Sequence, residues 1–249
     1  HDTMAAMKAA ARGEIDVAVL MGGNLLDANP QAAWARTALE RIGFRLCLTT
    51  TINRSHIDGN DGSECLVLPV TARDEEWEPT TQESMFNYVR LSDGGITRLE
   101  TVRPEVAILA DLAERLLPDS PIDWRTFAKH RTIREAIARI VPGMEALADI
   151  DVARQEFHIA GRILHTPRFN TPDGKAHFVT RSTPASHAAP LVLTTVRSEG
   201  QFNTIVYERT DSYRGGADRW TVMLAPGDIE KHGLADGGTA DLVSANGRM

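Results

Sequence analysis

The stretch 15–50 constrains the fold most, because in it two apolar strands flank one helix. Ile15–Met21 is an apolar run broken by a single acid, and Phe44–Thr50 is a second apolar run. A helix is predicted at about 30–42, since proline suits the first helical turn and Gly43 ends the segment. Strands that are apolar throughout and joined by a helix predict a β-α-β unit, in a parallel sheet covered on both faces.

The same signals place the other elements of an α/β domain over residues 1–150. Alanine content predicts a helix at about 2–12, and a Gly-Gly pair suggests a hairpin at 88–100. The acidic segment 73–78 is interpreted as a solvated loop rather than as paired catalytic carboxylates. The remaining predicted elements are a strand at 66–68 and helices at about 104–117 and 124–140.

Residues after 150 change to short strands with turn signals. Residues 151–190 are interpreted as a hairpin, turning at Thr-Pro-Asp-Gly 171–174, and a Ser/Thr/Pro/Ala-rich linker. Residues 191–249 are interpreted as a small β-barrel. Its predicted elements are strands at about 191–196, 204–207, 220–224 and 239–244, with a short helix starting at Pro226.

Composition bounds the function classes. The chain has 249 residues, enough for two domains, and its 42% hydrophobic and 24% charged residues argue against disorder. A net charge of -7 argues against non-specific nucleic-acid binding, which needs a basic surface. No apolar run approaches the length of a membrane-spanning helix, so no membrane span is predicted.

The two cysteines, Cys47 and Cys65, limit the metal chemistry of this chain. An iron–sulfur cluster needs four cysteine thiolates, and zinc sites need closely spaced ligands. Scattered histidines without ligand spacing do not complete such a site. No metal site is predicted, and both cysteines are interpreted as small hydrophobes on buried strands.

Polar residues follow the two predicted parallel strands, where ligands bind in sheets of this kind. The first strand ends in Gly-Gly-Asn, and glycine lets a backbone approach a ligand closely. The second ends in threonines and continues into Asn-Arg-Ser-His. The alternatives are a tight turn without ligand and a helix-capping loop, and for the histidine either a polar contact or packing. The candidate binding residues are Gly22, Gly23, Asn24, Thr50, Asn53, Arg54, Ser55 and His56.

A third candidate segment follows the apolar run 191–193. Two threonines and an arginine end this run, and hydroxyls with one fixed cation suit phosphates and the edges of a flat heterocycle. The alternative is an ordinary strand and loop with a solvent-facing arginine. The candidate residues here are Thr195, Arg197, Gln201, Phe202, Asn203 and Thr204.

Taken together, these motifs resemble the molybdopterin-dependent oxidoreductases of the formate dehydrogenase-like (FdhF/YdeP) family. The resemblance rests on the order and spacing of several segments and extends from about residue 2 to residue 244. The matching segments are Gly-Gly-Asn 22–24, Thr-Thr-Thr-Ile-Asn-Arg-Ser-His 49–56, Leu-Val-Leu-Pro 66–69, Thr-Pro-Asp-Gly-Lys-Ala-His-Phe 171–178, Leu-Thr-Thr-Val-Arg 193–197, Gln-Phe-Asn-Thr 201–204 and Asp-Ser-Tyr-Arg-Gly 211–215.

The resemblance implies a fold, a cofactor and a role. The fold is α/β followed by mostly β: a three-layer domain with a parallel sheet, then an incomplete double-psi β-barrel. The cofactor is bis-molybdopterin guanine dinucleotide with molybdenum or tungsten, and all fourteen candidate residues above would help to hold it. The metal ligand, any iron–sulfur cluster and all catalytic residues would lie upstream, outside a carboxy-terminal fragment that is inactive alone.

The implied activity is a cytoplasmic two-electron oxidation of a small molecule, with formate as the candidate substrate and no redox partner indicated. The alternative is a non-catalytic nucleotide-binding or scaffold module of similar fold. Released pterin and guanine nucleotide would distinguish the two.

Overall fold

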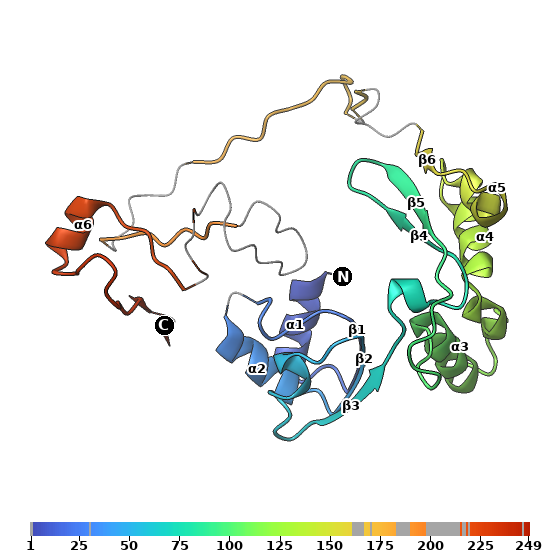
Figure 1. Cartoon of the computed structure of the whole chain (residues 1–249), viewed down its shortest axis with the longest axis horizontal. Coiled ribbons are helices and arrows are strands. Elements are labelled where there is room, and N and C mark those ends of the chain that lie inside the picture. Colours follow the sequence, from blue (N-terminus) through green and yellow to red (C-terminus); the bar gives the residue numbers. More distant parts are fainter. Residues whose placement is uncertain are drawn as a thin grey trace. The chain divides into compact units, whose positions relative to one another are not determined.

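The structure is a computed structural model of the 249-residue chain. It describes residues 2–29, 31–160, 167–169, 171–182, 190–197, 215, 218, 220–245 and 247–249. The chain divides into two units, His1–Ala176 and His177–Met249. Figure 1 shows the order of their elements along the chain.

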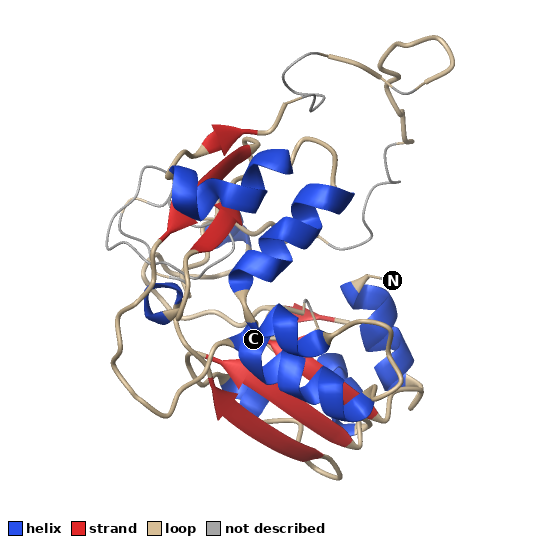
Figure 2. Ribbon diagram, turned by 90° about the vertical axis from the view of Figure 1, so that its right-hand side faces the viewer, coloured by secondary structure: helices blue, strands red, loops and turns tan. Residues whose placement is uncertain are grey.

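The first unit contains the predicted parallel sheet. Its strands β1 (Val17–Met21), β2 (Phe44–Thr49) and β3 (Glu64–Pro69) pair in parallel in the order β1-β2-β3. They are labelled in Figure 1, and Figure 2 draws the strands in red. Helix α2 (Ala32–Glu40) connects β1 to β2. The predicted β-α-β unit is therefore confirmed, and the third strand is longer than predicted.

Helices α1 (Thr3–Ala11) and α2 pack together beside one face of this sheet. The Asp2 side chain accepts a hydrogen bond from the Ala5 N–H at 2.7 Å and so caps α1. Small alanines allow the two helices to approach closely. Their shared core is Met7, Ala10, Leu26, Ala35, Ala38, Leu39 and Ile42, with Ala18 of β1 packed against it.

Helix α3 (Glu105–Leu116) packs against the other face of the sheet, with Leu109 and Leu112 near Leu46 and Leu48 of β2. β2 is therefore buried almost throughout. The prediction that both faces are covered is wrong for β1, whose Val17, Val19 and Met21 are exposed. β1 is an outer strand, and the α3 contacts reach β2 and β3 instead.

The predicted helix at 124–140 is two elements. A 3-10 helix, η3 (Trp124–Ala128), is followed by α4 (His130–Ile140), and Lys129 between them is extended, with φ -104° and ψ 127°. His130, the first residue of α4, contacts Glu76 through its side chain, far away in sequence. The short helices η4 (Glu145–Asp149) and α5 (Ile150–Ala153) follow.

The predicted hairpin at 88–100 is also displaced. β4 (Thr80–Glu83) pairs antiparallel with β5 (Tyr88–Ser92), and β6 (Phe157–His158) joins on the other side of β5. The chain turns at 84–87 rather than at the Gly-Gly pair. Those glycines instead pack on the backbone of Glu76, whose carbonyl accepts a hydrogen bond from the Gly95 N–H at 2.8 Å.

After residue 160, a predicted turn is confirmed, whereas several predicted strands are not. The turn at 171–174 is confirmed by a 3.0 Å hydrogen bond from the Gly174 N–H to the Thr171 carbonyl, although its described flanks are not strands. The second unit contains the predicted helix, α6 (Pro226–Lys231), and a small hairpin of β7 (Val243–Ser244) and β8 (Gly247–Arg248).

Of the strands predicted for this second unit, the segments 191–196 and 220–224 are described without strand pairing. The strand predicted at 239–244 is reduced to its last two residues, because β8 is its only described neighbour. The strand predicted at 204–207 lies outside the described residues. The double-psi barrel stays a prediction.

The described helices are short, and α3, with 12 residues, is the longest of them. Within the described ranges, none is both long and apolar enough to cross a membrane.

Candidate functional site

The loops that follow β1 and β2 lie against each other. The Asn53 side-chain amide donates a hydrogen bond to the Gly23 carbonyl at 2.8 Å, and the Gly22 N–H donates to the Leu48 carbonyl at 2.7 Å. The residues that follow the two strands therefore lie together at one edge of the sheet. We call residues 22–27 and 49–56 the strand-end site.

Gly22 and Gly23 have φ values of 60° and 76°, in a region that residues with a side chain rarely adopt. A Cβ built at either position meets nothing within 4 Å. The backbone conformation, rather than crowding, therefore requires glycine here. The open space leaves room for a ligand against the backbone.

Asn53 caps a single 3-10 turn, η1 (Arg54–His56). Its side-chain oxygen accepts hydrogen bonds from the Ser55 N–H at 3.0 Å and the Ser55 hydroxyl at 2.7 Å. Its backbone N–H donates to Nδ1 of His56 at 3.1 Å. The capping interpretation is therefore confirmed for these three residues, which use these groups within the loop.

His56 is 7% exposed, and its contact is polar rather than only packing. Burial lowers the pKa of His56, and the positive charge of Arg45 lowers it further. Because Nδ1 accepts a hydrogen bond from a backbone N–H, we assign the neutral ring with its proton on Nε2.

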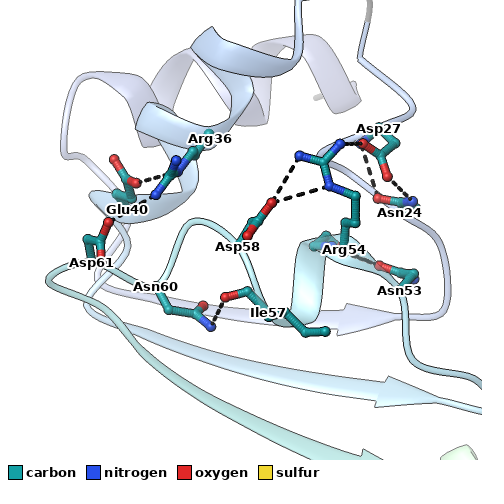
Figure 3. A network of polar contacts seen from close by, with 11 residues as sticks. Asn24, Asp27, Arg36, Glu40, Asn53, Arg54, Ile57, Asp58, Asn60 and Asp61 are labelled. Atoms are coloured by element: carbon teal, nitrogen blue, oxygen red, sulfur yellow. Dashed lines mark hydrogen bonds and ion pairs between the residues drawn. The ribbon is translucent and has the colours of Figure 1, made fainter.

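Arg54 lies between two carboxylates, as Figure 3 shows. Its guanidinium contacts Asp27 at 2.9 Å and Asp58 at 2.9 Å, and hydrogen bonding to Asp58, with the nearby charge of Asp27, raises the pKa of Arg54. The Asn24 side chain is also bonded to Asp27, accepting from its N–H at 3.1 Å and donating to its carboxylate at 3.0 Å. The positive charge of Arg54 is therefore already paired with carboxylates of the protein.

For the other candidate binding residues, the structure gives either an exposed position or no description. Thr50 is exposed, whereas the neighbouring Thr49 hydroxyl donates to the Thr51 carbonyl at 2.7 Å. Thr195 and Arg197 are exposed residues of the second unit. Gln201, Phe202, Asn203 and Thr204 lie outside the described residues.

Sequence reasoning missed the partners of Arg54. Asp58 follows Arg54 by four positions, a spacing that could have been noticed, whereas Asp27 carried no local signal. It also missed Arg45, which is 0% exposed within β2. A lone charge inside an apolar strand was the available sign that this residue has a structural or functional role.

The interpretation of 73–78 as a solvated loop is wrong for Glu76, which is 8% exposed. Its carboxylate accepts a hydrogen bond from the Thr71 hydroxyl at 2.7 Å and contacts Nε2 of His130 at 2.6 Å. A nearby Glu105 has a raised pKa, chiefly through burial and secondarily through the Glu76 charge. These contacts attach the loop to α4.

Both cysteines were predicted to be buried. Cys47 is buried, whereas Cys65 is only half-buried. Their sulfur atoms are 3.7 Å apart. Burial, followed by the Cys65 thiol, raises the pKa of Cys47 to about 12. Across the described residues, no group of three or more His, Cys, Asp or Glu is arranged to hold a metal ion.

The chain is similar to curated proteins named as oxidoreductases. It is 36% identical over 259 residues to proteins of Mycobacterium tuberculosis and Mycobacterium bovis that are named uncharacterized oxidoreductases. It is 28% identical over 231 residues to the protein YdeP of Escherichia coli K12. No protein-family model matches the chain.

These alignments cover 98% and 86% of this chain, but only 32% and 30% of the mycobacterial proteins and YdeP. The chain thus spans about a third of the length of the curated relatives it matches. Similarity across nearly the whole chain to proteins with this name supports an oxidoreductase family.

Proposed function

We propose that the chain is the cofactor-holding part of a molybdenum oxidoreductase of the formate dehydrogenase-like type, with bis-molybdopterin guanine dinucleotide as cofactor. The observation that carries the proposal is the strand-end site, where the Asn53–Gly23 hydrogen bond joins the loops after two parallel strands. Nucleotide ligands bind at such strand ends in α/β sheets. The names of the relatives support the redox class, and the motif resemblance supports the cofactor.

The residues of the strand-end site fit one portion of that cofactor better than another. The open backbone at Gly22 and Gly23 would accept a flat or sugar-like group. Arg54 is already paired with Asp27 and Asp58, and carboxylates repel phosphate oxygens but accept hydrogen bonds from N–H and O–H groups. We therefore assign the guanosine portion to this site, and the phosphates to donors outside it.

When bound, the metal centre supplies the two-electron chemistry, and the chain's residues bind and orient the dinucleotide. Asn24 and Asn53 each offer an amide near the open glycines, held in place by their bonds to Asp27 and Gly23. Formate is the candidate substrate, on the resemblance alone. A preformed loop binds with less loss of conformational entropy than a mobile one.

The test uses full-length protein produced with molybdate and compares two glycine substitutions. Gly23→Val places a side chain in the proposed site, and Gly13→Val is the matched control at the end of α1. Both glycines have positive φ, 76° and 73°, with nothing within 4 Å of an added Cβ. Both variants should therefore lose similar stability, about 1–2 kcal/mol or more for a β-branched residue.

Pterin, guanine nucleotide and molybdenum are then measured per folded molecule after denaturation. We expect all three to fall in Gly23→Val and to stay at the wild-type level in Gly13→Val. Equal contents in both variants would show that Gly23 only turns the chain. Guanine nucleotide without pterin or metal in the wild-type protein would instead favour the non-catalytic nucleotide-binding module.

A further inference from the structure

We propose that Arg45 is a positioning residue for the strand-end site, which it holds through Asn60, His56 and Asn53. The proposal deepens the proposed function and rests on it only for what the site binds. It begins from the burial of Arg45, whose side chain is fully enclosed within β2. A buried guanidinium is costly unless its N–H groups find acceptors.

All the recorded acceptors of Arg45 belong to the connection between β2 and β3. Its guanidinium donates to the Ser55 carbonyl at 3.4 Å, the Gly59 carbonyl at 2.6 Å, the Ser63 hydroxyl at 3.3 Å and the Asn60 side-chain oxygen. Every one of these acceptors is neutral, and within the described ranges no carboxylate forms an ion pair with Arg45. The charge is therefore placed where it fixes a loop, not where it balances an acid.

A continuous path of hydrogen bonds leads from Arg45 to the open glycines. The Asn60 side-chain amide, besides accepting from Arg45, donates to the His56 carbonyl at 3.2 Å and the Ile57 carbonyl at 2.8 Å, the second of which is drawn in Figure 3. The His56 ring accepts from the Asn53 N–H, and the Asn53 side chain donates to the Gly23 carbonyl. One buried cation thereby connects to both loops of the site.

The charge of Arg45 acts on the same path. A protonated His56 carries N–H on both ring nitrogens and could no longer accept from the Asn53 N–H. The other charged groups on these loops are Arg54, Asp27, Asp58 and Asp61. The Arg54 charge is matched by Asp27 and Asp58, and Asp61 pairs with Arg36 at 3.0 Å. Burial lowers the pKa of His56 most, and the Arg45 charge lowers it further, so that both favour the neutral ring. The neutral ring carries its proton on Nε2 and keeps Nδ1 as the acceptor of the Asn53 N–H.

Nitrogen-15 NMR of the histidine rings tests the proposal directly on the full chain. We expect wild-type His56 to be the Nε2-protonated tautomer, with a titration midpoint below that of an ordinary histidine. Arg45→Gln should raise the midpoint above the wild-type value, because the charge is lost while the burial remains. Arg45→Lys keeps the charge and should leave the midpoint near the wild-type value.

Asn60→Ala separates bonding from charge. It breaks the path but keeps Arg45, so the Gly23 and Asn53 amide resonances should shift while the His56 midpoint changes little. An Nδ1-protonated ring in the wild-type protein would overturn the proposal, whether or not the variants fold. An unchanged His56 midpoint in folded Arg45→Gln would overturn it as well. Absence of pterin from wild-type full-length protein would instead refute the proposed function and leave these NMR outcomes standing.

Discussion

Two adjacent glycines offer a sharp test of how the first unit is packed. Gly94 and Gly95 both have positive φ, 70° and 87°. A Cβ added to Gly94 would lie 2.4 Å from the Glu76 carbonyl oxygen, whereas one added to Gly95 meets nothing within 4 Å. Contacts shorter than 3.0 Å essentially never occur for real Cβ atoms, so the backbone would have to move.

The two substitutions should therefore differ by the clash alone. Each alanine carries a left-handed backbone cost of about 1–2 kcal/mol. Gly94→Ala adds an overpacking cost of about 1–3 kcal/mol, because the obstacle is backbone and not a flexible side chain. We expect a loss of about 2–5 kcal/mol for Gly94→Ala and about 1–2 kcal/mol for Gly95→Ala.

Urea unfolding followed by circular dichroism measures both losses. With a slope of about 2 kcal/mol per molar urea, the midpoint of Gly94→Ala should fall by about 1–2.5 M, and that of Gly95→Ala by about 0.5–1 M. Hydrogen exchange at the amide of residue 95, which is bonded to Glu76, reports the same region locally. Equal losses in the two variants would refute the close approach of Gly94 to Glu76.

The other two predictions concern titration and thiol reactivity. Hydrogen bonds from the Leu91 N–H, first, and the Tyr88 hydroxyl, second, lower the pKa of Glu156. The Glu156 carboxylate therefore contributes stability above its unfolded pKa of about 4.3, and this contribution is lost as the pH falls through its folded pKa. Glu156→Gln should reduce the loss of urea stability between pH 6 and pH 3, and an unchanged loss would contradict this. At pH 8 an aromatic disulfide reagent should label half-buried Cys65 first, because the pKa of about 12 keeps buried Cys47 protonated. Rapid native-state labelling of Cys47, measured by mass spectrometry, would refute that order.

Prediction from the sequence succeeded where the signal is local. Local sequence patterns indicate backbone conformation and burial, as the apolar runs of β1 and β2 and the glycine at 43 do. The parallel pairing of the two strands was predicted from these patterns. The strand-end site was predictable for the same reason, since parallel strands carry the residues that follow them to one edge. The sequence placed Asn53 and His56 at this edge, but it did not indicate that the Asn53 N–H would donate to Nδ1 of His56.

The tertiary structure decided every feature that depends on a distant partner. Glu76 was assigned to solvent from its charged neighbours, but His130, 54 positions away, gives it a buried partner. The Gly-Gly pair at 94–95 predicted a turn, yet it serves close packing on Glu76. Arg54 resembled a ligand-binding cation until Asp27, 27 positions earlier, was placed beside it. A sequence determines conformational preference position by position. The partner that satisfies a charge or fills a gap is decided only when the folded chain brings distant segments into contact, because electrostatic and packing energies depend on separation in space.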